Sequence, residues 1–169
     1  HHSNFIIWQR VQQRYGVKLE AIRPDGQGLF DLADFERAID DSTRVVAIPH
    51  VSNALGTIVP IREISEIAAR RGALTVIDGA QSVPHMKVDV REIGCDFLAF
   101  SGHKMCGPTG SGALYMKREV ATEIEPTFIG GGTIQDVSTD EYRLTSGWHR
   151  FEAGTPAIAE GIGLGRAVE

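Results

Sequence analysis

The chain has 169 residues, of which 42% are hydrophobic and 23% charged, and its formal net charge is -5. This is the composition of a globular domain with a sizeable core, and its acidic balance offers no basic field for nucleic acid or an anionic membrane surface. No apolar run reaches membrane-spanning length and no signal peptide is visible, so we expect neither a membrane nor a nucleic-acid partner. Two cysteines, Cys95 and Cys106, are too few for a disulfide framework and favour a reducing, cytoplasmic location. The histidines are scattered without metal-ligand spacing, and we expect no metal site.

The first part of the chain alternates helix and strand patterns. Apolar residues at helical spacing predict a helix over residues 5–15, ended by a glycine cap. Alternating apolar and polar residues predict a strand over 17–22. An N-capping aspartate predicts a helix over 31–41. Residues 45–48 are apolar without alternation, which predicts a central parallel strand.

The middle of the chain continues this alternation. A helix is predicted over residues 60–71, with a buried face formed by Ile61, Ile64, Ile67 and Ala68. Strands are predicted over 74–77, over 97–100 and over 112–116, and the second of them is apolar on both faces, as expected of a strand buried on both sides.

Helices are predicted over residues 117–125 and from residue 157 to the end. The glycine run at 130–133 is either a flexible turn or a backbone cradle for an anion. Strands that alternate with helices predict right-handed crossovers. We therefore expect an α/β fold with a three-layer, doubly wound and mostly parallel sheet.

Polar side chains follow three successive apolar strands. They are Asn53 after the first, Asp78 and Gln81 after the second, and Ser101, His103 and Lys104 after the third. Open parallel sheets bind ligands at the carboxyl ends of their strands, so these side chains are candidates for one site.

Each candidate also has a simpler interpretation. Lys104 is either a surface lysine or an amine whose lowered pKa allows it to form a Schiff base with a carbonyl compound. Asn53 either caps a turn or donates to a ligand. Asp78 needs a cation or a strong donor, and no second carboxylate joins it as a metal ligand would.

Together these residues match the needs of pyridoxal 5'-phosphate. That cofactor requires a lysine for covalent attachment and a carboxylate that keeps its pyridine nitrogen protonated, so that the ring accepts electrons. A dinucleotide site is the nearest alternative for this topology, but no Gly-x-Gly-x-x-Gly follows a strand.

Six motifs in order give the chain a family resemblance along its whole length. They are His-His-Ser-Asn at 1–4, His-Val-Ser-Asn-Ala-Leu-Gly at 50–56, Asp-Gly-Ala-Gln at 78–81, Ser-Gly-His-Lys at 101–104, Gly-Pro-Thr-Gly at 107–110 and Arg-Phe-Glu-Ala-Gly-Thr-Pro at 150–156. The chain resembles class V aminotransferases. Within that family it is most similar to cysteine desulfurases of the sulfur-mobilisation (SUF) type and to selenocysteine lyases.

The resemblance implies a fold-type I large domain and roles around the cofactor ring. Lys104 matches the lysine that forms the Schiff base and later acts as general base, and Asp78 matches the pyridine-nitrogen partner. Asn53 and Gln81 match residues that contact the ring.

The resemblance also implies contacts beyond the ring plane. Ser101 and His103 match phosphate ligands. His1 matches a histidine that stacks on the ring and moves protons. Thr155 matches a residue that reaches the phosphate of the other subunit, which implies a homodimer.

The implied reaction removes sulfur from L-cysteine, releases L-alanine and passes a persulfide to an acceptor protein, as in iron-sulfur cluster assembly. The persulfide cysteine of the family has no match here, since Cys95 reads as a core residue and Cys106 lies beside the cofactor lysine. Residues 1–169 are thus expected to be the central cofactor-binding part of the large domain, without its N-terminal segment or the C-terminal small domain, and inactive alone. The alternatives are a selenocysteine lyase acting on selenocysteine, a kynureninase-like enzyme, an epimerase, or a non-catalytic cofactor-binding and dimerising module.

Overall fold

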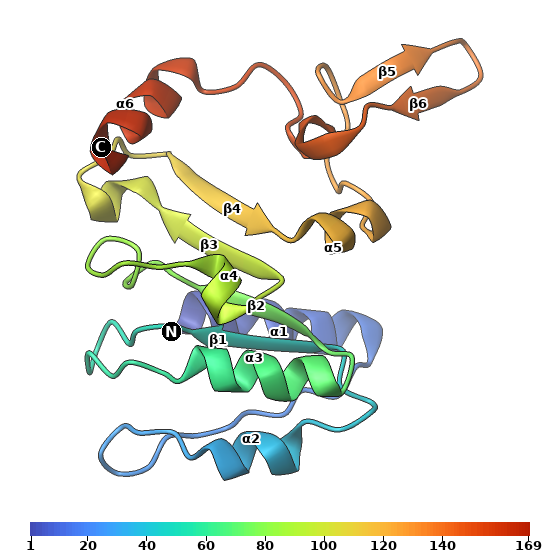
Figure 1. Cartoon of the computed structure of the whole chain (residues 1–169). Coiled ribbons are helices and arrows are strands. Elements are labelled where there is room, and N and C mark those ends of the chain that lie inside the picture. The colour runs from blue at the N-terminus through green and yellow to red at the C-terminus, as the bar shows by residue number, and fades with distance from the viewer.

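A four-stranded sheet runs through the centre of the computed structural model, which describes residues 1–169 (Figure 1). Its order is β1 (Val45–Pro49), β2 (Leu74–Asp78), β3 (Phe97–Ser101) and β4 (Gly112–Met116). The first three strands are parallel, and β4 returns antiparallel to β3. The α/β class and the mostly parallel sheet are confirmed, with β4 as the antiparallel exception.

Helices cover both faces of the sheet, giving three layers (Figure 1). The helices are α1 (His2–Tyr15), α2 (Leu32–Ala38), α3 (Ile61–Arg70), α4 (Val90–Ile93), α5 (Arg118–Glu123) and α6 (Ile158–Val168), with short 3-10 turns η1 (Gly102–Met105) and η2 (Gly147–Phe151). Helix α1 lies against β1 on one face, and α3 packs on β2 from the other, next to α2 and α4. None of these helices is long and apolar enough to cross a membrane.

Local sequence signals fix where the first helices begin and end. Gly16 closes α1 in the left-handed conformation, with φ 70°, and its amide donates to the Gln12 carbonyl. Asp31 begins α2, and its Oδ1 accepts a hydrogen bond from the Ala33 amide at 2.9 Å. Both caps agree with the sequence prediction, although α2 ends at Ala38 rather than near residue 41.

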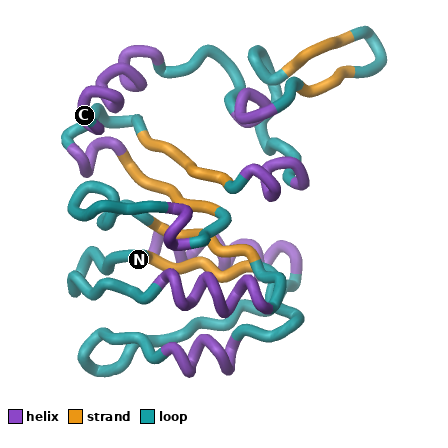
Figure 2. Tube along the Cα trace, in the orientation of Figure 1, coloured by secondary structure: helices purple, strands orange, loops and turns teal.

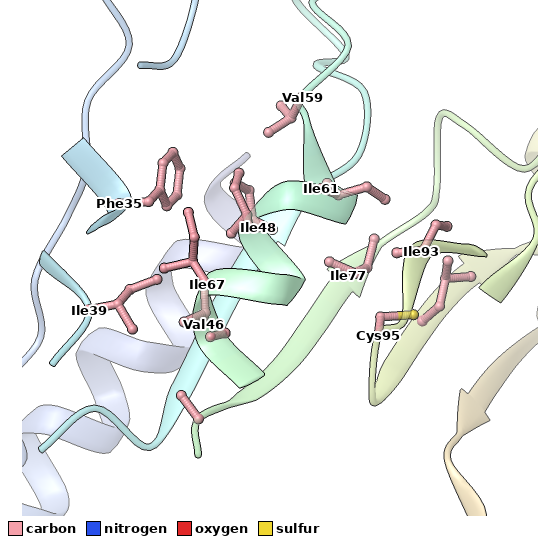
Figure 3. Close-up of a cluster of buried hydrophobic side chains, with 14 residues drawn as sticks. Phe35, Ile39, Val46, Ile48, Val59, Ile61, Ile67, Ile77, Ile93 and Cys95 are labelled. Carbon is pink, nitrogen blue, oxygen red and sulfur yellow. The ribbon is translucent and has the colours of Figure 1, made fainter. Parts of the chain in front are cut away.

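The core lies between the sheet and the helices α2 and α3 (Figure 3). Phe35 within α2 and Ile39 at its C-cap belong to one cluster with buried side chains of α3, β1 and β2 (Figure 3). The predicted buried face of α3 is confirmed in full, because Ile61, Ile64, Ile67 and Ala68 are all buried. This packing holds the carboxyl ends of the strands in a fixed order.

Shortening Ile64 by one methyl group is expected to lower the free energy of unfolding by about 1 kcal/mol. Ile64 is completely buried, so Ile64→Val leaves a void that its neighbours cannot fill without moving. Urea unfolding of the two proteins measures the difference. Ile6→Val is the matched control on exposed α1, where the side chain is 51% exposed and the same change should have little effect.

Some predicted features differ from the structure. Residues 17–22 form no strand, because their backbone groups pair with no neighbouring strand of this chain. Strand β1 is parallel, but it lies at the edge of the sheet and not at its centre. Its residues are apolar because helices cover both of its faces.

Strand β3 is not buried on both sides as predicted. Leu98 is buried but Ala99 is exposed, since α1 lies against β1 and not against β3. The hairpin of β5 (Ile134–Val137) and β6 (Tyr142–Leu144) was not predicted, and it extends away from the sheet (Figure 1).

Candidate functional site

Strands β1, β2 and β3 end at one edge of the sheet, where their following loops meet (Figure 2). The residues at this edge line a cleft. Side chains from the start of α1, the loop after β1, the end of β2 and the turn after β3 line it together. Its lining includes the predicted site residues His1, Asn53, Asp78, Gln81 and Lys104. His1 and Lys104, which lie at opposite ends of this stretch of sequence, therefore line the same cleft.

Asp78 is the most firmly held group of the cleft. It ends β2 in register with Pro49 and Ala99, and its backbone carbonyl accepts the His50 amide at 2.9 Å. Its Oδ1 accepts a hydrogen bond from the Ala80 amide at 3.0 Å, whereas no group of this chain donates to Oδ2. The carboxylate is thus oriented by the backbone and keeps one oxygen for a ligand.

Lys104 lies on the tight turn η1, directly after β3. Gly102 donates through its amide to the Ser111 carbonyl at 2.8 Å, and a side chain on Gly102 would collide with the Ser111 hydroxyl. Cys106 closes the turn with φ 63°, a left-handed conformation that costs a non-glycine residue about 1–2 kcal/mol. Lys104 makes no hydrogen bond or ion pair within the chain, so its amine is available to a ligand in the cleft.

In the loop after β1, the turn is capped by Ser52 and not by Asn53. The Ser52 hydroxyl caps the turn, accepting from the amides of Ala54 and Leu55 at 3.3 and 3.2 Å. The Asn53 side chain makes no hydrogen bond in the chain and lines the cleft. Its carboxamide is therefore available to a ligand, and Ser52 is a lining residue that the sequence reading did not single out.

His1 and Gln81 complete the predicted set on the cleft wall. The His1 ring caps α1, since its Nδ1 accepts from the Ser3 amide at 3.2 Å. The Gln81 backbone carbonyl lies 2.7 Å from His85 Nδ1. The Gln81 side-chain carboxamide makes no hydrogen bond in the chain and lines the cleft. Both side chains thus reach the cleft from segments whose backbones are anchored.

Three predicted residues are not among those that line the cleft. Ser101 is half-buried at the end of β3, His103 is exposed on η1, and Thr155 is exposed in the loop before α6. Ser101 and His103 flank the Lys104 turn, whereas Thr155 lies on a separate segment. Their assigned roles at the cofactor phosphate remain predictions.

The two cysteines have opposite environments. Cys95 is buried next to Asp96, and burial raises the pKa of its thiol to about 11. Cys106 is exposed on the turn that carries Lys104. Neither cysteine lines the cleft, and no three histidine, cysteine, aspartate or glutamate side chains gather as metal ligands.

Alkylation is expected to distinguish these two thiols. At pH 8, iodoacetamide should modify the exposed Cys106 at least about 100-fold faster than Cys95, because only the thiolate reacts and Cys95 is buried with its pKa raised to about 11. Peptide mass spectrometry of the native protein measures both rates, and denatured protein, where the rates should converge, is the control. Equal native rates would contradict the buried assignment of Cys95.

Burial raises the pKa of the Cys95 thiol, so the folded protein holds the proton of this thiol more tightly than the unfolded protein does. The free energy of unfolding should therefore fall as the pH rises from about 9 towards 11.

Comparisons with known proteins agree with this arrangement. The family model described as aminotransferase class-V matches residues 1–169. The "Probable cysteine desulfurase" of Halalkalibacterium halodurans is 50% identical over 169 residues, which is all of this chain and 42% of that protein. The chain therefore spans less than half the length of such relatives.

Solved structures show the same similarity in three dimensions. The apo structure of a cysteine desulfurase from Thermococcus onnurineus NA1 aligns with a TM-score of 0.95 at 50% identity, over 99% of this chain and 42% of that one. The cysteine desulfurase CsdA from Escherichia coli aligns with a TM-score of 0.95 at 36% identity, with the same coverage. From the match along its full length and the cleft that its motifs build, this chain belongs to the class-V aminotransferase family.

Proposed function

We propose that the protein is a pyridoxal-phosphate-dependent cysteine desulfurase that takes sulfur from L-cysteine and releases L-alanine. Residues 1–169 would be the central, cofactor-binding part of its large domain. The observation that carries this proposal is the single cleft in which Lys104, Asp78, Asn53, Gln81 and His1 meet. The names of the relatives support the same reaction.

The residues of the cleft fit the cofactor that class-V aminotransferases use. A pyridine nitrogen needs an anionic acceptor, and Asp78 has one oxygen fixed by Ala80 and the other unpaired. A reactive carbonyl group needs an amine, and Lys104 is the only lysine among the lining residues. Ala80, which lines the cleft beside Asp78, contributes only a methyl group to its wall. When bound, pyridoxal phosphate supplies a ring that accepts the electrons left behind as the substrate loses its α-proton.

Each side chain then has a definite task in the proposal. Lys104 would hold the cofactor through Nζ and, once the substrate amine has displaced it, take the α-proton at the same nitrogen. Asp78 would keep a proton on the pyridine nitrogen through Oδ2. Asn53 and Gln81 would donate their amide N–H groups to the ring oxygen, and His1 would stack on the ring and move protons.

The remaining contacts are proposed on the family resemblance. Ser101 and His103 would bind the phosphate from the strand end and the turn beside Lys104. Thr155 would reach the phosphate in the partner subunit of a homodimer. The sulfur would pass to an acceptor protein for iron-sulfur cluster assembly in the cytoplasm. Neither Cys95 nor Cys106 lines the cleft, so neither is assigned the sulfur-carrying role.

Incubation of the full-length protein with cofactor, L-cysteine and a thiol reductant tests this function. We expect sulfide and alanine in equal amounts, since one sulfur leaves each cysteine as one alanine forms. L-Selenocysteine, L-kynurenine and epimerase assays run in parallel separate the related activities. Cofactor binding without alanine release would contradict the proposal and favour a non-catalytic module.

A further inference from the structure

Gln81 lies on the irregular turn that follows β2 and lines the cleft. Its side-chain carboxamide is the group that the proposed function uses, and no hydrogen bond within the chain holds it. Where this carboxamide lies therefore depends first on how the turn holds the Gln81 backbone.

Backbone hydrogen bonds fix the turn on both sides of Gln81. The Gly79 carbonyl accepts the Val83 amide at 3.0 Å, and the Ser82 carbonyl accepts the His85 amide at 3.0 Å. No backbone amide, however, donates to the Gln81 carbonyl between them. This carbonyl is the one acceptor of the turn that is nearest to the useful carboxamide, and it needs a donor of another kind.

The two amides that could reach the Gln81 carbonyl locally are both unavailable. A helical or 3-10 turn would supply the amide of the residue three or four positions further along the chain. The third position is Pro84, which has no amide hydrogen. The fourth is His85, whose amide already donates to the Ser82 carbonyl. The sequence of the turn thus creates the gap in its own hydrogen bonding.

The His85 side chain fills this gap. Its Nδ1 lies 2.7 Å from the Gln81 carbonyl oxygen, and this is the only hydrogen bond that the oxygen makes in the chain. Because a carbonyl oxygen can only accept, the proton of this bond belongs to Nδ1. The ring therefore ties the Gln81 backbone to a residue four positions away, where the local backbone cannot.

We propose that His85 is a positioning residue of the cofactor site, acting through Gln81. His85 is exposed and does not line the cleft, so it would not touch the cofactor itself. By holding the Gln81 carbonyl, it keeps the turn in the conformation that presents the carboxamide to the cofactor ring oxygen. This inference rests on the proposed function, because it requires the cofactor in the cleft.

His85→Leu and His85→Asn form the matched pair that tests this role. Leucine has no N–H group, whereas the asparagine amide nitrogen is bonded to Cγ, as Nδ1 is, and still donates. In the full-length protein, His85→Leu should weaken the binding of pyridoxal phosphate about three- to tenfold, the effect of one lost hydrogen bond. His85→Asn should recover most of this loss. The measurement is an absorbance titration of the apoprotein with the cofactor.

A double-mutant cycle with Gln81→Ala distinguishes positioning from a general effect on the fold. If His85 acts through the Gln81 carboxamide, His85→Leu should weaken cofactor binding by less than about twofold in protein that already carries Gln81→Ala. A purely structural contribution of His85 would instead lower the affinity by the same factor in both backgrounds.

The protonated nitrogen of the ring can be observed without the cofactor. At about pH 8, where an ordinary histidine is neutral, nitrogen-15 spectra of protein labelled at its histidine rings should show the proton of His85 on Nδ1. His85→Asn assigns the signal. A proton on Nε2 alone would contradict the hydrogen bond to the Gln81 carbonyl.

Three results of the binding experiments would also overturn the inference. They are unchanged affinity in His85→Leu, no recovery in His85→Asn, and equal losses with and without Gln81→Ala. Cofactor binding without alanine release would contradict only the proposed desulfurase activity, since the binding comparison needs no turnover. An unchanged protein that binds no cofactor would contradict both proposals.

Discussion

Replacing Lys104 with alanine is expected to lower alanine release from L-cysteine by about 10³-fold or more. Lys104 is the only lysine on the cleft wall, so in the proposed reaction no neighbouring lysine could replace it in attaching the cofactor or removing the α-proton. The turn around it should persist, because it is held by backbone hydrogen bonds of Gly102 and Gly107 and not by the lysine side chain. The measurement is the initial rate of alanine release by the full-length protein with saturating cofactor.

Lys18→Ala is the control for this substitution. Lys18 is exposed and pairs only with Glu20, so its loss removes the same charge without touching the cleft. The visible absorbance of the bound cofactor should change in the Lys104 variant and remain in the Lys18 variant. A Lys104→Ala protein that keeps both the absorbance and the rate would remove Lys104 from the mechanism.

The sequence predicts the cleft well where a strand end determines the geometry. Asp78 and Lys104 follow apolar strands directly, and parallel strands bring their carboxyl ends to one edge. Periodicity therefore places these residues close together without knowledge of any contact. The same reasoning identifies Asn53, although only the structure shows that Ser52 caps the turn and leaves Asn53 free.

Other features depend on contacts that a linear pattern does not contain. The alternation at residues 17–22 is typical of a strand, but a strand exists only where another backbone pairs with it. His50 faces away from the cleft that Pro49 and Val51 line, and it shares a surface hollow with residues of the distant segment from Met86 to Ile93. Thr155 is exposed in the loop before α6 and does not line the cleft, so its role at the phosphate of a partner subunit stays a prediction.

Replacing Asp78 with asparagine is expected to reduce alanine release by about 10²–10³-fold while leaving the fold intact. The amide oxygen of asparagine can still accept the Ala80 amide, so the end of β2 should keep its conformation. The variant lacks the negative charge on Oδ2 that would keep the pyridine nitrogen protonated. The ring would then accept electrons less well, and the rate should fall much more than the affinity for the cofactor.

Asp25→Asn is the matched control, because it makes the same chemical change in the same kind of turn. Asp25 Oδ1 accepts the amides of Gln27 and Leu29 at 2.8 and 2.9 Å, and Asp25 is exposed and outside the cleft lining. Both variants lose one negative charge, so a general effect of net charge would appear in both. Urea unfolding should show a change within about 0.5 kcal/mol for each variant, which separates chemistry from stability. If Asp78→Asn releases alanine within about threefold of the unchanged protein, the carboxylate has no role at the pyridine nitrogen and the cleft binds a different group.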